Sequence, residues 1–180
     1  MLPLSIKETE LYDERANRFI KVKAQTIELE HSLLSISKWE SKWKKAFLSP
    51  LRKTNEETVD YIRCMTVTPR VDPNVYLCLT NADYIAVQEY IDDPMTATRF
   101  RGEKPQKGAP SRVNTSERIY ASMVTLGIPF TCEKWHLNRL LTLIHECEIQ
   151  GSGKRMSKGD SLNYAMQRNA ARRAKYHTRG

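Results

Sequence analysis

The sequence lacks any run of apolar residues near the roughly 18 that cross a membrane. Its first residues, MLPLSIKETE, also lack the basic start and long apolar run of a signal peptide. These absences predict a soluble protein that stays in the cytoplasm. The length of 180 residues fits one domain of ordinary size with appendages.

Cysteine is scarce, and its placement argues against a disulfide framework. The four cysteines form no CxxC pair and lie in segments that we expect to be helical. We therefore expect reduced, partly buried thiols at Cys64, Cys78, Cys132 and Cys147.

Motifs of catalysis and of metal binding are missing as well. No serine or cysteine lies in a GxSxG or similar nucleophile context, and we interpret His31 as a structural residue at a strand end. Cys132, Glu133 and His136 have helical spacings that metal ligands use, but His145 would lie on the opposite face. We predict no enzyme activity, no metal and no cofactor.

A glycine-rich segment, GSGKR at 151–155, invites comparison with a phosphate-binding loop. That loop requires a glycine where Glu148 stands and a hydroxyl residue where Arg155 stands, and a strand before it. We interpret the segment as a flexible joint between a helix and a tail.

Positive charge is concentrated at the end of the chain. Residues 151–180 hold eight basic residues and one acidic residue, which leaves +1 of the total +8 for residues 1–150. Such a tail can bind nucleic acid through counterion release, dock on an acidic protein surface or stay solvated. We expect the partner-binding residues there: Lys154, Arg155, Arg168, Arg172, Arg173, Lys175 and Arg179.

The first thirty residues are typical of β structure. Ile20 and Val22, then Ile27 and Leu29, alternate with polar neighbours at period two. A polar turn at 13–17 separates these runs from the preceding segment. The pattern predicts a small hairpin or a three-strand meander.

A tryptophan-bearing helix is expected next. Ile36, Trp39, Trp43 and Phe47 recur at steps of three and four, and Pro50 would end the helix. Tryptophans among lysines can stack on bases in single-strand binders. Because both tryptophans share the apolar stripe, we favour a place in the core.

Two shorter segments follow. Thr54 and Glu57 form a potential capping box for a helix that Pro69 closes. Asp72 is a candidate cap for a short helix over 73–79.

The middle of the chain alternates helix and loop. A helix is expected over 81–93, and glycines, prolines and cations predict a mobile loop over 96–112. Asn114 or Ser116 opens the next helix, which Gly127 stops at its C′ position.

The strongest helical pattern begins with Thr131 as its predicted cap. Leu137, Leu140, Leu141 and Ile144 repeat at i, i+3, i+4 and i+7 and should be core. The sequence thus predicts an α+β, mostly helical fold. A globular domain over 1–150, with β structure in 1–30 and about five helices in 35–150, carries a basic helical tail over 151–180.

Several segments together resemble a family of small proteins from the structural gene modules of tailed bacteriophages and prophages. They span nearly the whole chain: TIELEHSLLSISKWESKW (26–43), DYIRCMT (60–66), DPNVY (72–76), YIDDPMTATRF (90–100), WHLNRLLTLI (135–144) and NAARRAKYHTRG (169–180).

The resemblance implies one of two roles. A tail assembly chaperone would bind tape-measure and tail-tube subunits temporarily in the host cytoplasm, whereas a virion protein of the tail, neck or head would be permanent. Other phage structural proteins are the implied partners, and a homo-oligomer and non-specific nucleic acid stay open. The junction Gly153-Lys154 is similar to places where many tail chaperones join two reading frames by a programmed frameshift.

Overall fold

The computed structural model of the chain describes residues 1–14, 17–98, 114–151 and 166. Its contacts divide the chain into two compact units, Met1–Ile144 and His145–Gly180. The part of the chain that is described holds five α-helices, two short 3-10 helices and four strands, which confirms the predicted α+β, mostly helical class. None of its helices is long and apolar enough to span a membrane.

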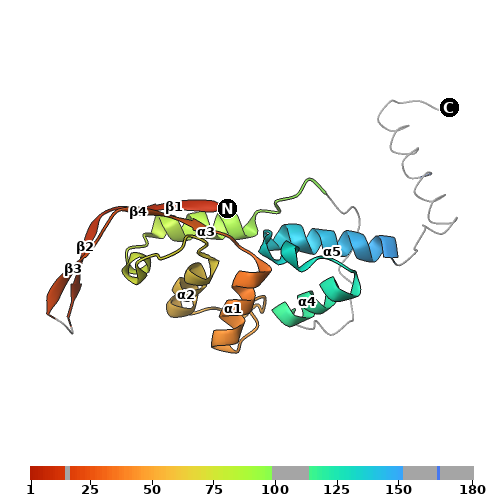
Figure 1. The fold of residues 1–180 in the computed structure, drawn as a ribbon, viewed down its shortest axis with the longest axis horizontal. Coiled ribbons are helices and arrows are strands. Elements are labelled where there is room, and N and C mark those ends of the chain that lie inside the picture. The colour runs from red at the N-terminus through yellow and green to blue at the C-terminus, as the bar shows by residue number, and fades with distance from the viewer. Residues whose placement is uncertain (15–16, 99–113, 152–165, 167–180) are drawn as a thin grey trace, which may run out of the picture. The chain divides into compact units, whose positions relative to one another are not determined.

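The strands form one antiparallel hairpin in two successive halves. In the base of the hairpin, β1 (Leu2–Ile6) pairs with β4 (Gln25–Leu29). In its outer half, β2 (Thr9–Asp13) pairs with β3 (Arg18–Val22). The hairpin alternative is therefore right, and the three-strand meander is not. Figure 1 shows β1 and β4 running beside α3 (Asn81–Asp92), while β2 and β3 lead away from the helices.

The base of the hairpin gains a further neighbour from the end of α2 (Asn55–Met65). The N–H of Glu30 donates to the carbonyl of Met65 at 2.9 Å, and the N–H of Val67 donates to the carbonyl of Glu28 at 2.8 Å. Ile27 and Leu29 are fully buried, as their alternation predicted. The sheet is thereby attached to the helical core.

The tryptophan-bearing helix, α1 (Leu33–Trp43), is shorter than predicted. A capping box of Ser32 and Ser35 starts it, and Lys44 ends it in the left-handed conformation with φ of 54°. Phe47 and Pro50 therefore lie beyond the helix. The carboxylate of Glu40 accepts the N–H of Phe47 at 2.7 Å, so this buried aromatic side chain reaches the core from a loop.

The local capping signals are confirmed. Thr54 and Glu57 form the capping box of α2, and the Asp72 side chain accepts the N–H of Asn74 at the start of the 3-10 helix η1 (Pro73–Leu77). Thr80 forms the corresponding box for α3.

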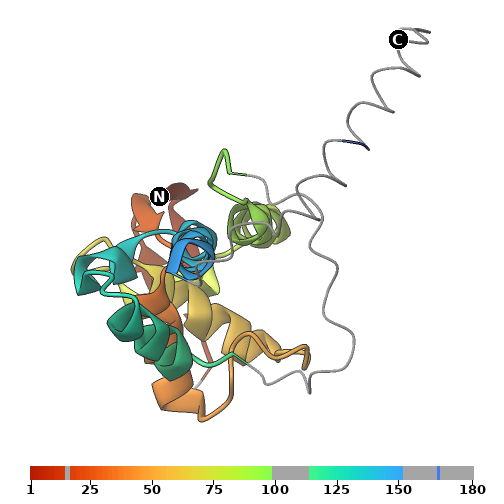
Figure 2. The same ribbon diagram turned by 90° about the vertical axis from the view of Figure 1, so that its right-hand side faces the viewer.

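Helix α4 (Ser116–Thr125) ends as the sequence predicts. Gly127 adopts φ of 65°, its N–H donates to the carbonyl of Val124, and the N–H of Ile128 donates to that of Met123. This is a Schellman motif, whose left-handed residue is usually glycine because glycine has no Cβ to clash in that conformation. Both views place α4 beside α1 (Figures 1 and 2).

The last helix begins five residues later than predicted, so Thr131 is not its cap. Residues Phe130–Lys134 form the 3-10 helix η2, Trp135 is extended, and α5 covers Leu137–Gly151. The cause is a β-bridge between Ser32 and His136, which holds the chain extended there.

The predicted core stripe of α5 is confirmed at three of its four positions. Leu137, Leu140 and Ile144 are buried, but Leu141 is only half-buried, so the stripe is narrower than predicted. The boundary between the two compact units falls inside this helix. Most of the predicted loop over 96–112, and the predicted tail beyond Gly151 except Met166, lie outside the described residues.

Candidate functional site

A buried histidine pair lies where the starts of α1 and α5 meet. The rings of His31 and His136 have centroids 5.1 Å apart, and both side chains are buried. The Nδ1 atom of His31 forms a hydrogen bond of 2.6 Å with the Tyr61 hydroxyl. His31 is therefore structural, as predicted.

His136 is held by the backbone of neighbouring segments. Its Nε2 donates to the carbonyl of Tyr90 at 2.9 Å, and its Nδ1 accepts the N–H of Asn138 at 3.3 Å. The N–H of Leu137 donates to the carbonyl of His31 at 2.7 Å. Both nitrogens of His136 thus form hydrogen bonds with the backbone.

The burial of His31 predicts a pH-dependent stability. Burial, and then the neighbouring His136, lower the pKa of His31 from 6.5 to about 3. In the unfolded chain His31 binds a proton near pH 6.5, whereas in the folded chain it stays neutral until a much lower pH. The free energy of unfolding is therefore highest above pH 6.5 and falls below it. We expect a loss of about 2 kcal/mol between pH 7 and pH 5, at 1.4 kcal/mol per pKa unit.

Urea unfolding at half-unit pH steps measures this loss. Most carboxylates stay ionised above pH 5 in the unfolded chain, so this window reports on the histidines, and a variant is needed to assign the share of His31. The variant His31→Asn keeps a polar partner for the Tyr61 hydroxyl and should remove most of the slope. An equal slope in the variant would assign the pH dependence to other groups.

The metal-like spacing in the sequence is not realised as a metal site. Cys132 and Glu133 lie in η2, whereas His136 follows the extended Trp135, so they do not share one helical face. The Tyr120 hydroxyl donates to the Glu133 carboxylate at 2.7 Å. Within the described ranges, no group of three potential ligands could hold a metal, and all four cysteines are free, as predicted.

The two tryptophans of α1 differ in burial. Trp39 is 1% exposed and donates its Nε1–H to the carbonyl of Glu57 at 2.8 Å, which confirms the core prediction. Trp43 is only half-buried and donates to the Asp60 carboxylate at 2.9 Å. The ammonium of Lys42 lies over the ring of Trp43 and pairs with Asp60, so part of this ring is already covered.

Two buried carboxylates anchor the lysines of this region. Lys45 pairs with Glu57, and its hydrogen bond is the main cause that lowers the pKa of Glu57. Burial opposes ionisation of Asp60, but hydrogen bonds from Lys42 and Trp43 hold its pKa below the ordinary value. These contacts join α1 and the residues just after it to α2 and are structural.

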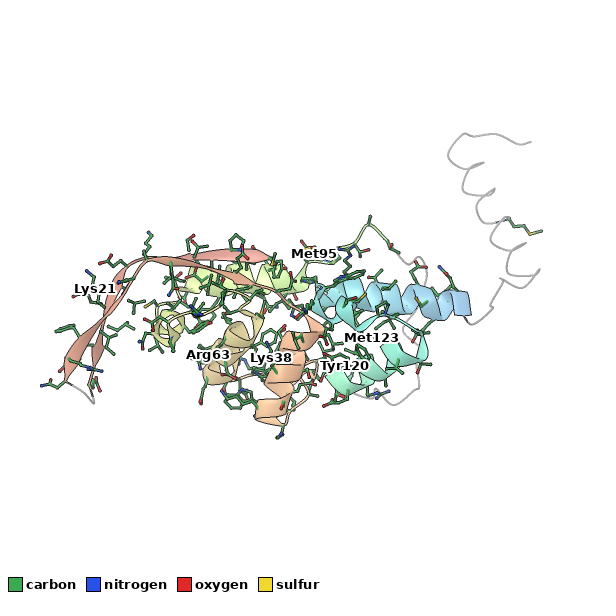
Figure 3. The ribbon with its side chains drawn as sticks, viewed as in Figure 1. Lys21, Lys38, Arg63, Met95, Tyr120 and Met123 are labelled. Carbon is green, nitrogen blue, oxygen red and sulfur yellow. The ribbon has the colours of Figure 1, made fainter. Side chains whose placement is uncertain are left out.

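The outer half of the hairpin exposes an aromatic pair. Tyr12 and Phe19 lie opposite each other in the β2–β3 register, with ring centroids 5.2 Å apart. They are 53% and 71% exposed. On the same face, Lys21, labelled in Figure 3, pairs with Glu8 at 2.6 Å. We call the ribbon formed by β2 and β3 the β arm.

A pocket of about 490 Å³ lies at the base of the hairpin, near the start of α1 and the end of α2. Its apolar lining includes Leu34, Met65 and Val67. Charged groups at the pocket are Glu30, Lys38, Lys134 and the Met1 amine, and Figure 3 shows Lys38 on α1. Cys64 also lines it, and burial raises the pKa of this thiol, which disfavours a reactive thiolate.

The sequence predicts the partner-binding residues in the basic tail, not in the β arm or at the pocket. All seven, from Lys154 to Arg179, lie outside the described residues. The β arm and the pocket were missed. Tyr12 and Phe19, which flank the predicted turn, were the one local signal available for the arm. The pocket lining comes from four separate segments of the sequence and has no local pattern.

Comparison with known proteins identifies no relative. No family model matches the sequence, and neither a curated protein nor a solved structure matches it significantly. The assignment of function therefore depends on the residues themselves and on the resemblance described above.

Proposed function

We propose that this chain is a non-enzymatic protein of tailed-phage morphogenesis. As a tail assembly chaperone, it binds tape-measure or tail-tube subunits in the host cytoplasm and leaves the finished particle. The resemblance to phage structural modules supports the phage context, and the β arm supports protein binding.

The exposed aromatic pair of the β arm is the observation that carries the proposal. A two-stranded ribbon on its own is marginally stable in water, and Tyr12 and Phe19 present much of their rings to solvent. Aromatic side chains are enriched at the energetic centres of protein interfaces. Buried polar side chains in the described part of the chain all have hydrogen-bond partners, so the polar interior serves the fold.

The test replaces the aromatic pair and measures capture of the proposed subunits. The double variant Tyr12→Ala/Phe19→Ala should weaken binding of a tail-tube or tape-measure subunit by about 2 kcal/mol, or roughly thirtyfold in Kd. The matched control Leu77→Ala/Ile85→Ala removes two side chains that are 67% and 59% exposed. The Kd of this control should stay within about twofold of the wild-type Kd, since exposed positions outside an interface contribute little to binding.

Isothermal titration calorimetry with purified subunits provides the measurement. Circular dichroism of each variant checks that the fold is retained. Absence of measurable binding by the wild-type chain to either subunit would refute the proposed function. Equal losses of affinity in both double variants would show that the β arm is not the binding surface.

Two alternative roles, a permanent virion protein and a nucleic-acid-binding protein, predict different experimental results. Stoichiometric amounts of the chain in purified particles, measured by mass spectrometry, would exclude the chaperone and support the alternative of a permanent virion protein. A nucleic-acid-binding role through the basic tail predicts that affinity for random DNA falls by orders of magnitude between about 50 and 200 mM salt.

A further inference from the structure

The pocket at the base of the hairpin combines an apolar wall with cations that are not neutralised. Met65 is 1% exposed and Val67 is 54% exposed, so the apolar wall extends from the core to the surface. A volume of about 490 Å³ lies within the ordinary range of ligand pockets. The space can hold an apolar side chain of a partner.

The acidic group of the pocket is already occupied. One carboxylate oxygen of Glu30 accepts from the Tyr90 hydroxyl at 2.8 Å, and the other lies 3.3 Å from the Met1 amine. The Met1 amine therefore offsets the charge of Glu30, and Glu30 forms no ion pair with either lysine of the pocket.

Both lysines of the pocket can approach a ligand, because their side chains are exposed. Lys38 and Lys134 are exposed, and neither forms an ion pair with any residue in the described ranges. The first turn of α1 contributes Leu34 and Ser35 to the lining and contains no acidic residue, which adds to the positive potential. The pocket is thus complementary to an anion attached to an apolar group.

We propose that the pocket binds the C-terminal residue of a partner polypeptide. The apolar side chain of that residue lies against Leu34, Met65 and Val67, and its terminal carboxylate accepts hydrogen bonds from Lys38 and Lys134. This inference rests on the proposed function, because it names the part of the partner that the chain recognises. Capture of a C-terminal carboxylate is a recurrent mode of peptide recognition.

A chain terminus fits this arrangement better than an internal acidic residue. A terminal apolar residue carries its carboxylate on the same Cα as its side chain, so one residue reaches both the apolar wall and the lysines. An internal aspartate or glutamate provides the charge but no apolar group for Met65 and Val67.

Fluorescence anisotropy with labelled peptides tests the proposal on the full chain. The probes are the C-terminal segments of the tail-tube and tape-measure subunits, each made as a free acid and as a C-terminal amide. Amidation should weaken binding at least about tenfold, the loss expected for a charge-assisted hydrogen bond. The double variant Lys38→Met/Lys134→Met should bind acid and amide equally, and the control Lys44→Met, outside the pocket, should keep the preference for the acid.

The outcomes separate this inference from the proposed function. Subunit capture that survives deletion of the subunit's last residue, or equal binding of acid and amide by the wild type, overturns the inference while leaving the proposed function standing. Dodecanoate that displaces the peptides with the same lysine dependence and higher affinity would also overturn it, since it would assign the pocket to a fatty acid. Failure of the wild type to bind either subunit removes the proposed function itself.

Discussion

Replacing Glu40 with alanine is expected to destabilise the chain by about 3–5 kcal/mol, because buried donors then lose their acceptor. The Glu40 side chain is buried, and one carboxylate oxygen accepts the N–H of Phe47 at 2.7 Å. The other accepts the N–H of Ser116 at 2.8 Å and its hydroxyl at 2.6 Å. The carboxylate thus caps α4 in place of Thr115, whose own side chain makes no capping hydrogen bond.

Urea unfolding at pH 7 measures the effect. The control Ser116→Ala removes only the hydroxyl contact and should cost about 1 kcal/mol, the ordinary contribution of one hydrogen bond. The variant Glu40→Gln, which keeps an acceptor oxygen, should fall between the two. If the free energy of unfolding of Glu40→Ala lies within about 1 kcal/mol of the wild-type value, the carboxylate does not stabilise the contacts with Phe47 and Ser116.

Truncating Trp39 is expected to be as damaging, whereas truncating Trp43 is not. Trp39→Ala removes a side chain that is 1% exposed, for which large-to-small replacement costs about 3–5 kcal/mol. Trp43→Ala removes a half-buried ring and its hydrogen bond to Asp60, so we expect a loss of about 1–2 kcal/mol.

The two variants form a matched pair on one helix. Their free energies of unfolding, measured under the same conditions, should differ by at least 1 kcal/mol. Equal losses would mean that the two rings are buried alike. A separate titration with single-stranded DNA checks the base-stacking alternative, because selective loss of DNA binding in Trp43→Ala would revive it.

Signals within a few residues of each other predicted the local structure well. The capping box of Thr54 and Glu57, the Asp72 cap and the Gly127 stop depend on neighbours in sequence, and all three are confirmed. Alternation at period two likewise placed Ile27 and Leu29 in the core.

Contacts that helical periodicity does not describe decided the features that were mispredicted. Phe47 leaves the helical stripe because Lys44 ends α1 and Glu40 binds the following backbone. Thr131 does not cap α5 because Ser32, far earlier in the chain, pairs with His136. Helical periodicity gave Leu141 a place in the stripe, but only packing determines how wide that stripe is.

The candidate site was the least predictable part. Composition predicts a binding site at the basic residues of 151–180, because an excess of charge can be counted in the sequence alone. The pocket brings together Met1, Lys38, Val67 and Lys134 from separate segments, and no spacing rule relates them. The exposure of Tyr12 and Phe19 follows from the course of the hairpin away from the helices, which strand periodicity does not specify.

The hydrogen bond from Leu137 to the carbonyl of His31 has a consequence for synthesis on the ribosome. Chains emerge from the N-terminus at about 5–20 residues per second, so the hairpin and α1 leave the ribosome well before α5 does. Until then, the carbonyl of His31 lacks the N–H of Leu137 as its hydrogen-bond donor. A nascent chain halted before Leu137 would carry every strand and four of the five α-helices of the described part, yet would lack the buried side chains that α5 adds to the core.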